Sequence, residues 1–186
     1  FYAVLCHAND IIRLAGEPDN SLQNREMLRA VAYFAQGISL GYIGLLYDKG
    51  FVATHETVPE RVQEPRPYKE LIAEALKSLD QTISISKTHE FTIPDGWIPG
   101  DRWNNEDLAR LASSCAARLL VYSARNKTED DATHWAAVYE YARNGILKDF
   151  APMADDLKWY SEYHMYSNFT GRSEEHTSEL QSRQSI

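Results

Sequence analysis

The sequence predicts an all-α fold of antiparallel helical hairpins that are joined by long loops. Three observations support this prediction. Apolar residues recur at helical spacing in nearly every segment that looks ordered. The one alternating pattern, at 81–86, prolongs a good helical pattern, so we assign it to that helix. Proline and glycine gather in two segments, 48–66 and 87–103, which are too long for simple bundle connections and are the kind of loop that often carries function.

The first two predicted helices form the N-terminal part of the chain. The first has its apolar stripe over residues 4–15 and ends at Gly16, a common residue just past a helix. The second follows Asn20 and Ser21, either of which can cap a helix, and its helical spacing continues to Ile38. We expect these two stripes to face a common core.

Three further helices are predicted. The third opens with Pro67 in its first turn, where a proline is well tolerated. The fourth begins at Asn104 and Asn105, with two acidic residues near its positive end. The fifth follows a capping box at 128–131 and ends at Gly145.

The stretch Gly37-Ile-Ser-Leu-Gly41 spells G-x-S-x-G, the pattern of the serine-hydrolase nucleophile elbow. That elbow requires a strand before the serine, whereas Ser39 follows several turns of helical pattern. We therefore interpret Gly37, Gly41 and Gly44 as positions where a neighbouring backbone approaches closely. The uncharged run 30–47 is just long enough to cross a membrane, but its polar residues and glycines favour a helix buried in a protein core.

The composition of the chain narrows the kinds of partner and site that we expect. The chain has 186 residues and a formal net charge of −8, and this acidic balance argues against nucleic acid as a main partner. Cys6 and Cys115 lie on predicted apolar stripes, so we expect two buried free thiols, with a disulfide between them left open. No histidine pair has metal-ligand spacing with a carboxylate, and we predict no metal and no cofactor.

Five segments, in this order, carry a resemblance to the SusD/RagB family of surface nutrient-binding proteins. They are HANDIIRLAG, with an Ala-Asn pair; NREMLRAVAYFAQGISLGYIGLLYDKGFV, with an Arg-Ala pair before aromatic residues and a glycine; PYKELIAEALKSLDQTI, with a Tyr near its start; NNEDLARLASSCAARLLVYSAR, with its Leu-Ala and Ala-Arg-Leu elements; and HWAAVYEYARNGI. The resemblance covers about residues 1–150. It departs from the family at Tyr47-Asp48-Lys49-Gly50-Phe51, where many members have a Gly-Asp-x-Pro turn.

The resemblance implies a helical fold of tetratricopeptide-like type and a function without catalysis. The helix pairs at about 21–87 and 104–146 also resemble tetratricopeptide units loosely. Members of the SusD/RagB family are lipid-anchored on the outer face of the outer membrane. They capture oligosaccharides or other nutrients and deliver them to a TonB-dependent transporter of SusC type. We therefore expect this chain to bind a nutrient, to have such a transporter as its partner, and to be no enzyme.

The loop at 87–103 offers candidate ligand-binding residues. Sugar recognition uses flat aromatic faces surrounded by amide, Arg or carboxylate groups. Trp97, Arg102, Trp103 and Asn104 provide this composition. The competing interpretation is that Trp97 and Trp103 pin the loop to the helices while Asn104 caps the next helix. The alternative function is a tetratricopeptide-type protein-interaction module that binds no glycan.

The two ends of the chain indicate a fragment. Residues 172–182, RSEEHTSELQS, match the translation of a common sequencing-library adapter. We expect 172–186 to be a non-native tail and 1–171 to be a fragment of a SusD/RagB-like helical domain. The signal sequence and lipid anchor of the full-length protein are expected outside this fragment.

Overall fold

A computed structural model of the chain describes residues 1–17, 21–57, 64–98 and 102–152. The chain divides into two compact units. The first unit contains residues 1–94 and 102–150, and the second contains 95–101 and 151–186. The predicted tail at 172–186 lies outside the described residues, as does the predicted capping residue Asn20.

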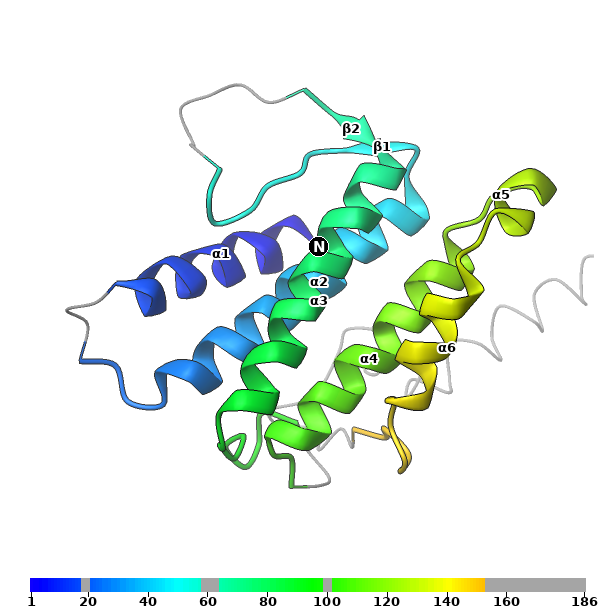
Figure 1. Ribbon diagram of the computed structural model, residues 1–186. Coiled ribbons are helices and arrows are strands. Elements are labelled where there is room, and N and C mark those ends of the chain that lie inside the picture. Colours follow the sequence, from blue (N-terminus) through cyan, green and yellow to red (C-terminus); the bar gives the residue numbers. More distant parts are fainter. Residues whose placement is uncertain (18–20, 58–63, 99–101, 153–186) are drawn as a thin grey trace, which may run out of the picture. The chain divides into compact units, whose positions relative to one another are not determined.

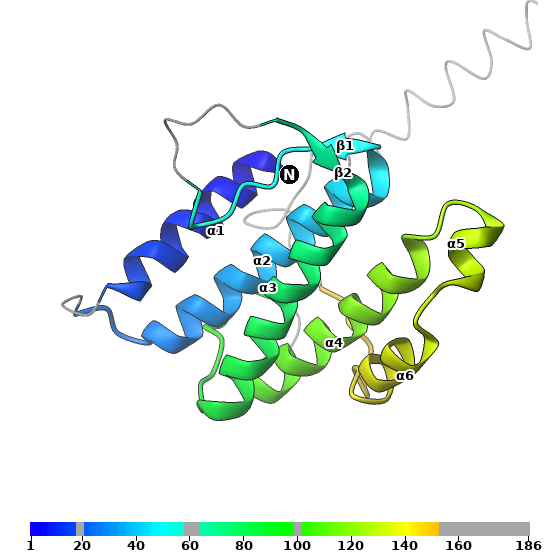
Figure 2. The ribbon, with the colours of Figure 1, turned by 45° about the horizontal axis from the view of Figure 1, so that its top comes forward.

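The first unit is helical, with one very small sheet. Its elements are α1 (Tyr2–Gly16), α2 (Arg25–Leu46), β1 (Lys49–Gly50), β2 (Arg66–Pro67), α3 (Tyr68–Thr88), α4 (Asn105–Tyr122), α5 (Lys127–Asp131) and α6 (Trp135–Arg143). Helices that follow one another in the order α1, α2, α3, α4 and α6 pack against each other, and the most extensive of these interfaces joins α2 and α3. Figures 1 and 2 show these helices running alternately in opposite directions. The predicted all-α class and antiparallel packing are confirmed.

The core lies where α2, α3 and α4 meet. Its fully buried side chains include Leu40 of α2, Leu71 and Leu79 of α3, and Ala116 of α4. Gly37 makes the close approach of α2 and α3 possible. A Cβ atom there would lie 2.9 Å from Leu79 Cγ and 3.0 Å from the carbonyl oxygen of Ala75. The predicted packing role of this glycine is confirmed, and Ser39, 3% exposed, lies inside α2 with no strand before it.

A chain of buried polar side chains connects α1, α2 and α3. Gln36 of α2 donates from Nε2 to Asn9 Oδ1 of α1 at 2.7 Å, and Ser78 Oγ of α3 donates to Gln36 Oε1 at 2.7 Å. Asn9 Nδ2 in turn donates to the carbonyl oxygen of Ala53 at 3.1 Å. Buried polar groups are costly when they lack hydrogen-bond partners. This series of hydrogen bonds therefore specifies how the three helices align.

The two-residue strands β1 and β2 were not predicted. They pair antiparallel, with Lys49 opposite Pro67 and Gly50 opposite Arg66. Strands of two residues show no alternation of apolar and polar side chains, and their pairing depends on where α2 ends and α3 begins. Pro67 belongs to β2 and occupies the N-cap of α3, not its first turn as predicted.

Two helix starts also differ from prediction. The second helix begins at Arg25, because Asn24 has a φ of 57°, which interrupts the helical conformation. The predicted fifth helix is two helices. Asn126 caps the short α5 by accepting a hydrogen bond from Glu129 N–H, and α6 begins separately at Trp135.

The cysteines are both free, but they are not both buried. Cys115 is partly buried, whereas Cys6 is exposed. Helix α1 packs against essentially one neighbour, α2, so only a narrow stripe of its surface is covered. The prediction of burial was wrong for Cys6 because its position lies at the edge of that stripe.

Candidate functional site

The four sequence-predicted ligand-binding residues are divided between the two units. Trp97 belongs to the second unit, where it follows Gly96 in a turn and is 42% exposed. Arg102, Trp103 and Asn104 belong to the first unit. Arg102 is exposed at the start of that segment.

Trp103 is buried, with 3% of its surface exposed. Its ring meets Phe150 edge-on at 5.2 Å between centroids, and Lys148 Nζ lies 4.9 Å from the ring centroid. Its carbonyl oxygen accepts from Ile93 N–H at 2.8 Å. Trp103 thus packs against the segment that follows α6, and its faces are not open for stacking.

Asn104 caps α4 in a capping box. Its Oδ1 accepts from Asp107 N–H at 3.0 Å, and Asp107 Oδ2 accepts from Asn104 N–H at 3.3 Å. The predicted cap is confirmed. Such reciprocal bonds satisfy two of the free N–H groups at a helix start.

A polar pocket of about 250 Å³ lies beside this cap. Its walls come from the end of α3, the first turns of α4 and the residue after α6; they include Lys87, Asn105, Glu106, Arg110, Ser113 and Asn144. A smaller hollow of about 160 Å³ shares Arg110 and includes Trp103. Sequence reasoning missed Lys87, Arg110 and Asn144, because only the packing of α6 on α4 brings them together.

A larger groove of about 450 Å³ lies between α3 and the end of α4 with α5. Half of the residues that line it have aliphatic side chains: Ile72, Ala73, Leu76, Leu120, Ala124 and Ala132. Lys69, Glu129 and His134 are the charged or titratable groups that line it. Apolar walls with a few placed polar groups are typical of binding sites.

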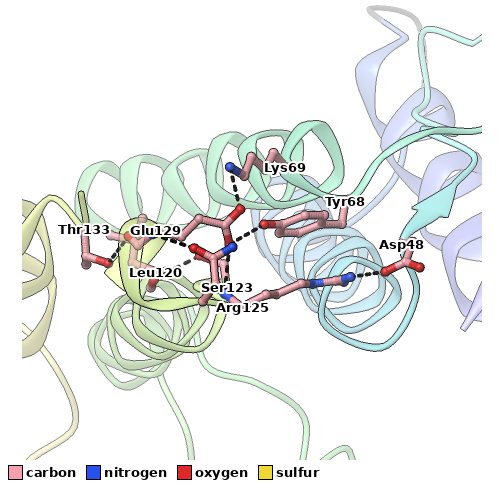
Figure 3. Close-up of polar contacts among 9 residues, drawn as sticks. Asp48, Tyr68, Lys69, Leu120, Ser123, Arg125, Glu129 and Thr133 are labelled. Atoms are coloured by element: carbon pink, nitrogen blue, oxygen red, sulfur yellow. Dashed lines mark hydrogen bonds and ion pairs between the residues drawn. The ribbon is translucent and has the colours of Figure 1, made fainter. Parts of the chain in front are cut away.

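Glu129 is the centre of a polar network at the edge of this groove (Figure 3). Its Oε2 accepts from the Tyr68 hydroxyl at 2.7 Å and from Arg125 N–H at 2.8 Å. Its Oε1 lies 2.9 Å from Lys69 Nζ. These donors lower the pKa of Glu129 to about 2, with the Lys69 hydrogen bond as the largest cause.

The same contacts affect the partners of Glu129. Burial, followed by the hydrogen bond to Glu129, raises the pKa of Tyr68. The hydrogen bond to Glu129 raises the pKa of Lys69. All three groups therefore keep the protonation states that favour the network at neutral pH.

Arg125 connects this network to the end of α2. Its Nη2 donates to the carbonyl oxygens of Gly44 at 2.9 Å and Tyr47 at 2.8 Å, and its Nη1 pairs with Asp48. Its guanidinium also lies 3.8 Å from the centre of the Tyr68 ring. Figure 3 shows Arg125 lying between Asp48 and Glu129. The sequence signal for this role was weak, because an arginine after a helix is common.

No group of three or more His, Cys, Asp or Glu side chains among the described residues is placed to hold a metal ion. No helix in this part of the chain has the length and apolar character needed to cross a membrane.

Comparisons with known proteins add no relative. No protein-family model matches the chain, and neither the curated proteins nor the solved structures gave a significant match.

Proposed function

We propose that this chain is part of a nutrient-binding protein of SusD/RagB type. It captures an oligosaccharide or another nutrient at the outer face of the outer membrane and delivers it to a TonB-dependent transporter of SusC type. Binding involves no chemical step and no cofactor. The lipid anchor of the full-length protein keeps it at that membrane.

One observation carries the proposal. The end of the second resembling segment, the start of the third and the end of the fourth lie in contact. Arg125, the last residue of the fourth segment, binds the end of the signature helix at Gly44, Tyr47 and Asp48. It also lies against Tyr68, the tyrosine near the start of the third segment. Contacts among these positions support the view that the segments belong to one inherited arrangement.

The test is a calorimetric titration of the chain with neutral oligosaccharides, such as glucans, mannans and xylans, and with acidic oligosaccharides. Trp97 is exposed in the predicted binding loop, and Trp135 on α6 is exposed elsewhere, at 53%. We expect saccharide binding that Trp97→Ala weakens at least tenfold, because stacking on an aromatic ring contributes substantially to such sites. Trp135→Ala, the matched control, should bind like the parent chain.

The opposite results would overturn the proposal. They are the absence of binding to neutral and acidic saccharides alike, or equal losses in both tryptophan variants. The transporter partner is tested separately with the full-length lipoprotein in outer membranes. Cross-linking to a TonB-dependent transporter supports the proposal, and cross-linking only to other proteins counts against it.

The aliphatic groove favours a second candidate, a tetratricopeptide-type module that binds a protein segment. Its wall offers leucine, isoleucine and alanine but no phenylalanine, tyrosine or tryptophan, which suits apolar peptide side chains better than sugars. Ala73 is exposed on that wall, so Ala73→Arg should block the groove without disturbing the core. Peptide binding that is lost in this variant, together with no saccharide binding, would favour the second candidate.

A further inference from the structure

The polar pocket at the α3–α4 end contains two positively charged side chains without acidic partners. Lys87 and Arg110 line it, and within the described part of the chain neither makes an ion pair. Arg110 makes only a long hydrogen bond, 3.4 Å, to the carbonyl oxygen of Gly145. Most other described Lys and Arg residues are paired with a carboxylate. An acidic chain that leaves two neighbouring cations unpaired in one pocket can attract an anion there.

The remaining walls suit hydroxyl groups. Asn144 donates from Nδ2 to the carbonyl oxygen of Glu140 at 2.7 Å, so its Oδ1 is left as an acceptor. Ser113 donates to the carbonyl oxygen of Ala109 at 2.9 Å, and its oxygen can still accept. Glu106 adds a carboxylate that also accepts hydrogen bonds. Acceptors of this kind bind the hydroxyl groups of a ligand.

A buried hydroxyl in the same wall lacks a partner. Ser86 is 1% exposed, and its Oγ makes no hydrogen bond within the described structure. Leaving a buried hydroxyl unsatisfied is unfavourable by about 1–3 kcal/mol. Ser86 belongs to the pocket wall, so a small adjustment on binding would give this hydroxyl a partner.

A second hollow shares a wall with the pocket and lies at the end of the sequence-predicted loop. Arg110 also lines the smaller hollow that contains Trp103 and Lys148. Asn105, which follows the predicted residue Asn104, holds the pocket in shape by donating to the carbonyl oxygen of Ser86 at 2.9 Å. A ligand unit in the pocket would therefore lie beside the segment that begins with Arg102.

We propose that this pocket binds an acidic sugar unit, a uronic acid, within an oligosaccharide. The carboxylate pairs with Arg110 and Lys87, and the ring hydroxyls bind Asn144, Ser113 and Glu106. A volume of about 250 Å³ admits one sugar ring and not a chain of them. A phosphate group fits the pocket less well, because Glu106 repels a second negative charge while the acceptors would lack hydroxyl partners. The inference rests on the proposed function and names its substrate class.

The experiment compares three probes by calorimetry: a galacturonic acid oligomer, the same oligomer with methyl-esterified carboxyl groups, and the neutral galactose oligomer. The acid form should bind at least tenfold more tightly than either of the others. Arg110→Gln should reduce this affinity roughly ten- to a hundredfold, because it removes a charge-assisted hydrogen bond. Lys87→Gln should act in the same direction.

Arg118→Gln is the matched control, because Arg118 lies on the same helix and lines none of the pockets described above. It should retain the affinity of the parent chain, and circular dichroism should show all variants folded. Equal binding of the acid, ester and neutral probes would overturn the inference while leaving the proposed function standing. Equal binding of succinate would overturn the sugar assignment. Absence of binding by every saccharide would overturn both proposals.

Discussion

Helices α1 to α4 each bury several side chains, whereas α5 and α6 contain no buried residue. In the first region, apolar contacts and a buried polar chain act together. In the second region, Trp135 and Tyr139 of α6 are 53% and 64% exposed. Tyr141 of α6 is only partly buried against the core, and its hydroxyl donates to Asp80 Oδ1 at 2.7 Å. The difference implies that the two regions of one unit differ in local stability.

Arg125 and Glu129 lie at the junction of these regions. Arg125 binds the end of α2, and Glu129 binds the first turn of α3 from α5. The network therefore ties the weakly buried α5 to the well-buried helices through hydrogen bonds, without adding apolar contact. The contrast in stability between α1–α4 and α5–α6 can be tested by changing the hydrophobic core, the buried hydrogen bonds of Gln36 and the network at Glu129.

The largest effect is expected from truncation of the core. Leu79 is fully buried and Tyr139 is mostly exposed. Leu79→Ala should lower the free energy of unfolding by about 3–4 kcal/mol, because it removes buried methyl groups and leaves a cavity. Tyr139→Ala should change it by less than about 0.5 kcal/mol. Urea unfolding, monitored by circular dichroism, measures the free energy of unfolding of both variants. Similar losses in the two variants would show that α1–α4 and α5–α6 do not differ in stability.

A smaller effect is expected from breaking the buried polar chain. Gln36→Ala removes the hydrogen bonds to Asn9 and from Ser78 and leaves a buried acceptor unpaired, so we expect a loss of about 2–3 kcal/mol. A double-mutant cycle with Ser78→Ala should give a coupling of about 1 kcal/mol. If the stability losses of the two single variants simply add in the double variant, the buried hydrogen bonds do not act as a unit.

The smallest effect concerns Glu129 and depends on pH. Its pKa is lowered from 4.5 to about 2 in the folded protein, so the folded state favours the ionised carboxylate. The resulting stabilisation is complete above about pH 5 and is lost as the pH falls through about 2. Glu129→Gln removes it. The urea midpoints of the parent and the variant should therefore differ more at pH 7 than at pH 3, and an unchanged difference would contradict the assigned ionisation.

The site was predictable only in part. Asn104 as a cap follows from the residues around it, because a cap and its partner are three positions apart. Trp103 was a candidate for ligand stacking, but Phe150 and Lys148 cover it, and neither is close to it in sequence. The polar pocket and the groove had no sequence signal, since each combines residues from three segments.

The sequence by itself determined the all-α class, the four long helices apart from the start of α2, the cap of α4 and the tight contact at Gly37. These depend on apolar spacing and on neighbours within a few positions, which the order of residues states directly. Only the tertiary structure decided the pairing of β1 with β2, the burial of Trp103, the exposure of Cys6 and the network at Glu129. The hydrogen bond from Tyr68 to Glu129 spans 61 positions. Such contacts exist only once α3 and α5 are neighbours, and that depends on how the whole set of helices buries its apolar surface.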